Sequence, residues 1–291
     1  MTEKRRLGSA GPRVFPVGLG CMPMSLEGRP DEAASARVIL AALEAGVELL
    51  DTADAYCIDE GEMGHNERLV ARALREWPER ERVVVATKGG LRRPGGGYAH
   101  DGRPEYLAAA CERSLRALGV ERIDLYYLHA PDERVPFADS LGALARLREQ
   151  GKIRLAGVSN VDAAQLTSAL DTLPIACVQN RASPFHPQGL EDGVLALCER
   201  EELAFVAHSP VGGWQAGRIA HEPLLQELAS ALGATCHQVA IAWLLARSRS
   251  LIPIPGASRI RSAEGSAAAA GLRLPPEAVS RIDRHYGEPA S

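Results

Sequence analysis

The sequence lacks long hydrophobic runs and paired cysteines, and each absence excludes a class of protein. No stretch of about 18 uncharged apolar residues occurs, so a membrane-spanning helix is not expected. The six cysteines form no CxxC pair, which argues against a disulfide framework and favours a reducing, intracellular setting. The first residues, MTEKRRLGSA, are basic but have no apolar stretch behind them, so they do not resemble a secretory signal. We therefore expect a cytoplasmic protein.

An excess of charge of one sign is missing as well. The 33 Lys and Arg residues oppose 37 Asp and Glu residues, without a long run of one sign, so nucleic-acid binding is not expected. Lysine is scarce: Lys4, Lys88 and Lys152 are the three in the chain, and a lysine in an apolar setting therefore needs a specific reason. What the chain does have is 46% hydrophobic residues over 291 positions, which is ample for a large core.

Short aliphatic runs alternate along the chain with longer segments whose apolar residues recur at helical spacing. The predicted strands are Val17–Leu19, Glu48–Asp51, Val83–Lys88, Ile123–His129, Ile153–Ser159, Ala176–Asn180, Ala204–His208 and Leu251–Ile254. The predicted helices are Asp31–Ala45, Asn66–Trp77, Pro104–Leu118, Pro136–Gln150, Val161–Leu173, Gly189–Glu202, Cys236–Arg247 and Ser258–Ala270. Eight such units predict an α/β fold, a (β/α)8 TIM barrel, as one domain over residues 1–291. A doubly wound sheet fits less well, because VGLGCMPMS after the first strand has no GxGxxG.

Smaller signals agree with this fold. Gly46, Gly119 and Gly151 end three predicted helices just before a strand, at the left-handed position that glycine fills without strain. Ahead of the first strand, RRL and RVF flank a glycine-rich turn, which predicts an N-terminal β-hairpin across the bottom of the barrel. After the last unit, Pro275 and Pro276 introduce a short C-terminal helix.

The reactive groups of a barrel lie where its strands end. The second predicted strand ends in DTADAY, with Asp51, Asp54 and Tyr56, the third ends in Lys88, and the fourth ends in His129. Three neighbouring strands thus bring titratable groups to one edge.

Lys88 is the most informative of these residues, because it follows five apolar or small residues. Burial disfavours its charge unless an anion lies close, and Asp51 on the adjacent strand is the natural partner. Such a pair can also serve packing alone. A nearby ammonium would lower the pKa of Tyr56 from about 10 toward neutrality and make the phenol a general acid or base. By itself, His129 fits a structural role as well as a functional one.

The motifs DTADAY, VVVATKGG, LYYLHAPD, GVSN, VQN, AHSP and IPIPGAS, in this order, resemble the aldo-keto reductase family. The resemblance implies a catalytic tetrad of Asp51, Tyr56, Lys88 and His129. It also implies a nicotinamide cofactor, NADPH rather than NADH, that delivers hydride to a carbonyl carbon, and it implies no metal. Tyr56 would donate the proton, Lys88 with Asp51 would lower its pKa, and His129 would orient the carbonyl.

The same resemblance assigns the cofactor site. Ser159, Asn160 and Gln179 would hold the carboxamide of the nicotinamide, and Ser209 would lie along the pyrophosphate. The adenosine 2′-phosphate would meet a segment after the last strand that comprises Gly256, Ala257, Ser258 and Arg259. The guanidinium of Arg259 suits a phosphate, although an arginine at a helix start is also often merely solvated.

Three positions depart from the family pattern. His208 replaces the aromatic ring that often stacks on the nicotinamide. Gly265 and Ser266 replace the acidic and amide residues that grip the adenine. Cys57 follows the tyrosine in place of glycine and leads into the acidic segment IDEGEMGHNE, which either shapes the substrate pocket or is solvated.

The substrate is expected to be a small aldehyde, ketone or sugar. Its candidate contacts at the barrel mouth are Met22, Met24, Leu91–Tyr98, Asp132 and Trp214. The segment RRPGGGYAHDGR fits either a mobile flap or a disordered loop. We favour a monomer, since no exposed apolar stripe stands out.

Three other functions are alternatives for this sequence. The same site could oxidise a sugar or alcohol as an NAD(P)-dependent dehydrogenase, or the chain could be a non-enzymatic nicotinamide-binding regulatory subunit. A metal-dependent hydrolase with Asp51, Asp54 and His129 as ligands fits poorly, because Lys88 would repel the ion.

Overall fold

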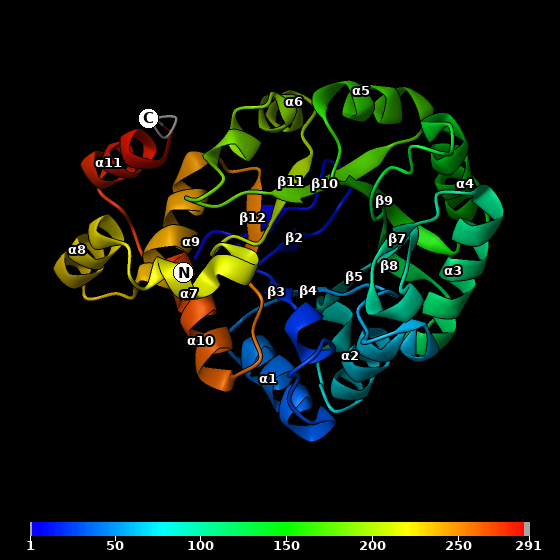
Figure 1. Ribbon diagram of the computed structural model, residues 1–291, viewed down its shortest axis with the longest axis horizontal. Coiled ribbons are helices and arrows are strands. Elements are labelled where there is room, and N and C mark those ends of the chain that lie inside the picture. The colour runs from blue at the N-terminus through cyan, green and yellow to red at the C-terminus, as the bar shows by residue number, and fades with distance from the viewer. Residues whose placement is uncertain (1, 288–291) are drawn as a thin grey trace.

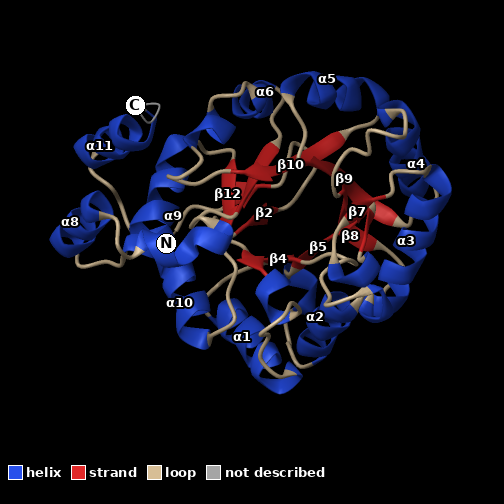
Figure 2. Ribbon diagram, viewed as in Figure 1, coloured by secondary structure: helices blue, strands red, loops and turns tan. Residues whose placement is uncertain are grey.

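A computed structural model describes residues 2–287 of the protein, and its centre is a barrel of eight parallel strands (Figures 1 and 2). The strands are β3 (Leu19–Gly20), β4 (Leu49–Asp51), β5 (Val84–Gly89), β8 (Ile123–Leu128), β9 (Ile153–Ser159), β10 (Ile175–Arg181), β11 (Ala204–His208) and β12 (Leu251–Ile254). Each strand pairs with the next one along the chain. The ring closes through a parallel bridge between Gly20 and Gly256. The predicted (β/α)8 barrel is confirmed; the predicted single domain also covers residue 1 and residues 288–291, which lie outside the described part.

Most of the helices surround the barrel and separate its strands from solvent, while others lie outside that ring (Figure 2). They are α1 (Glu32–Glu44), α2 (His65–Arg75), α3 (Pro104–Leu118), α4 (Phe137–Glu149), α5 (Ala163–Thr172), α6 (Val194–Arg200), α7 (Ala216–Ile219), α8 (Pro223–Leu232), α9 (Cys236–Arg247), α10 (Ile260–Ala268) and α11 (Pro276–Gly287). Helices α7 and α8 were not predicted, because strict alternation suggested one helix after each strand. Between residues 2 and 287 no single helix could cross a membrane by length and composition, although α8 and α9, bent by 89° at their junction, meet that criterion as a pair.

The helix ends show why the chain turns where it does. Asp31 accepts a hydrogen bond from the Ala34 amide at 2.7 Å and so begins α1. At the other ends, the glycines predicted from sequence have left-handed backbones, with φ of 95° at Gly46, 67° at Gly119 and 74° at Gly151. A side chain in that conformation would be strained, so glycine allows the chain to leave the helix for the next strand.

The floor of the barrel is closed by the predicted N-terminal hairpin of β1 (Arg5–Arg6) and β2 (Arg13–Val14). Leu7 and Val14 of this hairpin join the apolar core inside the barrel, where they meet inward side chains such as Leu125. A second and larger core lies between the strands and the helices. Since the hairpin fills one end, the carboxyl ends of the strands form the open face.

The segment RRPGGGYAHDGR after β5 is a hairpin, which makes the expectation of a disordered loop wrong. Its strands β6 (Leu91–Arg92) and β7 (Ala99–His100) pair antiparallel across a glycine turn, in which Gly95 and Gly96 have positive φ. Arg92 pairs with Glu60 at 2.7 Å, and Arg134 donates a hydrogen bond to the His100 carbonyl. These contacts tie the hairpin to the loops on both sides.

Candidate active site

A cavity of about 640 Å³ opens at the carboxyl ends of the strands. Its walls come from the β6–β7 hairpin, from Gln179 of β10 and from the loops after β3, β4, β8, β9, β11 and β12. Asp51, Tyr56 and His129 face into it. It therefore lies where the chemistry of a barrel enzyme is expected.

Beneath this cavity, Lys88 forms three hydrogen bonds with its ammonium group. Its Nζ donates to Asp51 Oδ1 at 2.5 Å, to the Tyr56 hydroxyl at 2.9 Å and to the Thr52 carbonyl at 2.9 Å. The second oxygen of Asp51 accepts from Gln179 Nε2 at 2.7 Å. Because every N–H of the ammonium has an acceptor, this buried ion pair meets the condition under which a charge is tolerated away from water.

The strand register brings these groups together. Asp51 lies opposite Ala86 in the β4–β5 ladder, so Lys88 lies two residues further along the same face. The chain then turns back: the Asp54 amide donates to the Lys88 carbonyl at 3.3 Å, and the Gly64 amide donates to the Asp54 carbonyl at 2.7 Å. This turn places Tyr56 above the lysine.

The pKa of Tyr56 differs from the expectation. Burial raises the pKa of this phenol well above its usual value, and the negative charge of Asp51 raises it further. The predicted drop toward neutrality is therefore wrong, because desolvation of the buried phenol dominates its pKa. Burial also lowers the pKa of Lys88, although Asp51 opposes that shift. Tyr56 is consequently a neutral phenol at physiological pH.

His129 stands edge-on to Tyr56, with ring centroids 5.8 Å apart. Burial, together with the charge of Lys88, holds the pKa of His129 well below its usual value, so the imidazole is neutral. Within the described chain its Nδ1 has no hydrogen-bond partner. Two uncharged hydrogen-bond donors, a phenol and an imidazole, thus border the same space.

A polar network next to His129 also lines the cavity. Asn160 donates to the His129 carbonyl at 3.0 Å, and its side-chain oxygen lies 3.2 Å from Nε2 of His208. The other ring nitrogen of His208 is 3.1 Å from the Ser209 hydroxyl. Asn160 and Ser209 both have positive φ, 57° and 54°, which is uncommon for residues with a side chain and is often found at functional sites. Burial lowers the pKa of His208 to about 4, so this ring is neutral as well.

The structure gathers most of the predicted cofactor residues around this cavity but not all. The cavity is lined by Ser159, Asn160, Gln179, His208, Ser209, Gly256 and Ser258. Ala257 is buried, and Arg259 is exposed at the N-cap of α10; neither lines the cavity. Gly265 and Ser266 lie within α10.

On the substrate side, Met22, Leu91, Tyr98 and Trp214 line the cavity as expected. Two other candidates do not. Met24 is fully buried in the core between the strands and the helices. Asp132 is buried, pairs with Arg134 at 2.9 Å and accepts a hydrogen bond from the Gly102 amide.

Sequence reasoning missed part of the wall. Leu26, Glu27 and Gly28 line the cavity from the loop after β3. Their place after the end of a barrel strand was the signal that could have identified them. The acidic segment after Cys57 is anchored by ion pairs: Glu62 pairs with Arg29 at 2.7 Å, and Glu60 pairs with Arg92.

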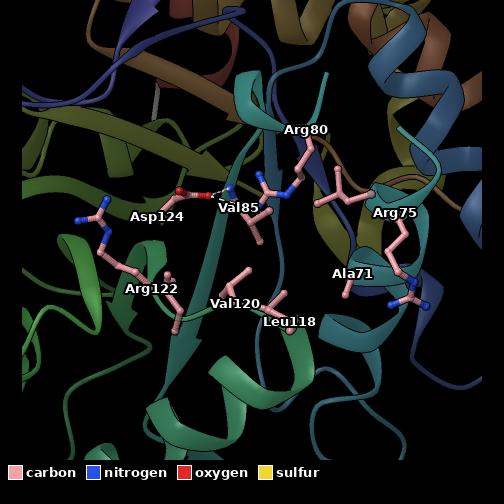
Figure 3. A pocket seen from close by; sticks show the side chains of 11 residues that line it. Ala71, Arg75, Arg80, Val85, Leu118, Val120, Arg122 and Asp124 are labelled. Carbon is pink, nitrogen blue, oxygen red and sulfur yellow. Dashed lines mark hydrogen bonds and ion pairs between the residues drawn. The ribbon is translucent and has the colours of Figure 1, made fainter. Parts of the chain in front are cut away.

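A second cavity lies in another part of the molecule. This cavity of about 290 Å³ lies between α2, α3 and the amino-terminal halves of β5 and β8, and neither Tyr56 nor Lys88 lines it (Figure 3). Its polar side chains are arginines and Asp124, whose carboxylate accepts a hydrogen bond from the Val85 amide at 3.0 Å. Among residues 2–287, no three His, Cys, Asp or Glu side chains form a group suited to a metal ion.

Comparison with known proteins agrees with this geometry. The model of the Aldo/keto reductase family matches residues 16–287. The glycerol dehydrogenase of Gluconobacter oxydans is 27% identical, with a TM-score of 0.86, over 100% of this chain and 98% of that one. An aldo/keto reductase of Klebsiella pneumoniae in complex with NADP and acetate is 26% identical, with a TM-score of 0.84, over 99% and 97% of the two chains. A structure of an aldo-keto reductase from Klebsiella pneumoniae with NADPH is 26% identical, with a TM-score of 0.83, over 100% and 98%. The chain therefore belongs to the aldo/keto reductase family.

Proposed function

We propose that this oxidoreductase is an NADPH-dependent carbonyl reductase with Tyr56 as the proton donor. The observation that carries the proposal is the hydrogen-bonded chain from Asp51 through Lys88 to Tyr56, which ends at the cavity beside His129. These hydrogen bonds place one polarised phenol at the wall of the cavity. The substrate is a small aldehyde or ketone.

The cavity fits a nicotinamide cofactor. Ser159, Asn160 and Gln179 offer hydroxyl and amide groups that match a carboxamide, and Gly256 and Ser258 leave room for a phosphate at the other end. Arg259 lies next to Ser258 and supplies a cation for the 2′-phosphate. The relatives crystallised with NADP and NADPH support the same choice. When bound, the reduced nicotinamide supplies a hydride.

The residues then have distinct roles. Tyr56 donates its proton to the carbonyl oxygen, and the ammonium of Lys88, 2.9 Å from the hydroxyl, stabilises the phenolate that remains. Asp51 keeps Lys88 charged in spite of its burial. The neutral imidazole of His129 donates a hydrogen bond to the same carbonyl oxygen and orients it.

Burial raises the pKa of Tyr56, so the phenol keeps its proton at neutral pH. Reduction needs a protonated phenol, whereas oxidation of an alcohol needs a phenolate to accept the proton. The protonated phenol is the form that donates to a carbonyl oxygen, as the role proposed for Tyr56 requires.

Tyr56→Phe tests the proposal. This variant removes the proton donor and keeps the ring, so we expect unchanged NADPH affinity, measured by fluorescence titration, and a fall in the rate of propanal reduction of about 10²–10⁴-fold. Tyr126→Phe is the matched control, because Tyr126 is a fully buried tyrosine that does not line the cavity. An unchanged rate in Tyr56→Phe would refute the assigned role. NADPH binding without turnover by the unaltered protein would favour a regulatory subunit instead.

A further inference from the structure

At the floor of the barrel, the N-terminal hairpin borders a cavity of about 640 Å³, which is as large as the cavity at the open face. The other walls of this floor cavity come from the C-terminal end of α9, from residues 248–249 and from residues 270–274 after α10. It shares no lining residue with the candidate active site. A cavity of this volume has room for a small organic molecule.

Cations dominate the walls of the floor cavity. Among residues 2–287, seven lysine or arginine side chains line it, against one carboxylate, that of Glu3. Three of the cations form ion pairs: Lys4 with Glu48, Arg247 with Asp283 and Arg249 with Glu3. The other four have no carboxylate within ion-pair distance in the described part of the chain: Arg5, Arg6, Arg13 and Arg273. This excess of positive charge is local, since the whole protein has a net charge of -4.

Arg6 and Arg13 lie directly opposite each other in the β1–β2 ladder. Like charges at such a pair of positions destabilise a hairpin. The Nη1 of Arg13 donates to the Lys4 carbonyl at 3.3 Å, a bond that orients the side chain but leaves its charge unpaired. An anion bound between the two guanidinium groups would replace this repulsion by attraction.

Arg5 adds a partly buried cation to the same wall. Its guanidinium donates to three carbonyls at the end of α9, those of Leu245 at 2.5 Å, Ser248 at 2.6 Å and Leu251. These bonds hold the group in one position. Burial, followed by the charge of Arg249, lowers the pKa of Arg5 to about 10. The crowding of guanidinium groups thus disfavours the charged form of Arg5, and a bound anion would favour it.

The chemistry of these walls defines the ligand. A guanidinium group donates paired hydrogen bonds to the oxygens of phosphate or carboxylate. Because a hollow lined by charges of one sign concentrates their field, an anion with two or more charges is attracted more strongly than a monovalent one. Leu245, Leu272 and Leu274 also line the cavity and offer an apolar surface to the body of an organic ligand.

We propose that the floor cavity is a binding site for a small organic anion with two or more phosphate or carboxylate groups, which Arg6, Arg13 and Arg273 contact. The site is separate from the proposed carbonyl reductase site, and its test does not depend on that activity.

Isothermal titration calorimetry with inorganic pyrophosphate, citrate and acetate, at constant ionic strength, tests this inference. We expect at least one of the two multivalent anions to bind with a Kd at least about tenfold lower than that of acetate. A lower Kd for pyrophosphate than for citrate would identify phosphate as the preferred group, and the reverse order would identify carboxylate. Equal Kd values for all three anions, or no binding of either multivalent anion, would refute the proposal.

Two variants locate the bound anion, because the proposed cofactor cavity at the open face also accommodates phosphate. Arg6→Gln and Arg273→Gln change exposed side chains of different segments of the floor cavity, and circular dichroism checks that both variants fold. We expect each to raise the Kd of the preferred anion about tenfold, since each removes a charge-assisted contact. Arg37→Gln is the matched control, because Arg37 is exposed on α1 and lines neither cavity.

The outcomes separate this site from the active site. An unchanged Kd in Arg6→Gln and Arg273→Gln, or an equal rise in Arg37→Gln, would overturn the floor site. Failure of the protein to reduce aldehydes would refute the proposed reductase and would leave the anion site standing.

Discussion

Asp54, three residues after Asp51, is a carboxyl group in a place where a charge is costly. It is almost fully buried, and within the described chain neither of its oxygens has a hydrogen-bond partner. Arg113 is 3.8 Å away at the protein surface. Burial, followed by the neighbouring charge of Glu67, raises the pKa of Asp54 well above its usual value. Asp54 therefore binds a proton in the folded protein at pH values where the unfolded chain has released it.

This proton makes the stability of the protein depend on pH. The stability that this proton contributes is fully present below the pKa of the unfolded aspartate, near 4. It decreases by about 1.4 kcal/mol per pH unit above that value and is lost as pH rises through the pKa of Asp54 in the folded protein. We expect Asp54→Asn to remove part of this pH dependence. The free energy of unfolding of the variant should therefore increase relative to that of the unaltered protein between pH 5 and 8. Urea unfolding at several pH values measures the difference.

Asp132→Asn is the control for that experiment. The hydrogen bonds from Arg134 hold the pKa of Asp132 well below its usual value, so this buried carboxylate stays ionised between pH 5 and 8. Its replacement should cost stability by the same amount at each pH in that range. Equal pH slopes for the unaltered protein and Asp54→Asn would contradict the proton assigned to Asp54.

At the scale of single residues, contacts between side chains were easier to predict than the pKa values of buried groups. The pair of Lys88 and Asp51 followed from their places on adjacent strands, because strand register alone sets that contact. The pKa of Tyr56 did not follow, because it depends on how completely the cavity wall desolvates the phenol. Part of that wall comes from Tyr98, a residue of a hairpin that the local sequence did not reveal.

At the scale of elements, the β6–β7 hairpin shows the limit of local patterns. Its strands have two residues each, and its glycine turn reads as a loop. Arg93 is held by the Ile58 carbonyl and Arg92 by Glu60, contacts that join segments about thirty positions apart. Helix α8 was not predicted, because strict alternation allowed one helix between two strands. Its LLQELASAL pattern is helical, but α8 is an additional helix between β11 and α9.

Two glycines test how the elements are packed. Gly265 lies inside α10, and a Cβ built there has no other atom within 4 Å. We therefore expect Gly265→Ala to raise the free energy of unfolding by about 0.5–1 kcal/mol. Gly89 ends β5, and a Cβ there would lie 2.1 Å from the Tyr126 hydroxyl. Gly89→Ala should therefore lower stability by about 1–3 kcal/mol. Urea unfolding followed by circular dichroism measures both, and shifts in the same direction would show that the packing has been misjudged.

At the scale of the whole molecule, the two ends of the barrel serve different purposes. The N-terminal hairpin fills the floor with Leu7, which is fully buried, while the reactive groups lie at the open face. We expect Leu7→Ala to cost about 2–5 kcal/mol of stability, because it leaves a cavity in the inner core. The affinity for NADPH, measured below the unfolding temperature, should stay unchanged. A weaker affinity for NADPH in the folded variant would show that the N-terminal hairpin and the binding cavity are energetically coupled.

The alternation of strand and helix predicted the barrel, but its closure depends on residues far apart in the chain. The bridge between Gly20 and Gly256 joins the first and last strands, with the Gly18 amide donating to the Pro253 carbonyl and the Gly20 amide donating to the Pro255 carbonyl. A contact between such distant positions carries a high entropic cost of loop closure, so we expect it to form late in folding. Gly20 and Gly256 also line the cavity. The binding pocket is thus completed by the same event that closes the ring, and a chain that has folded all but this junction has secondary structure but no complete place for a ligand.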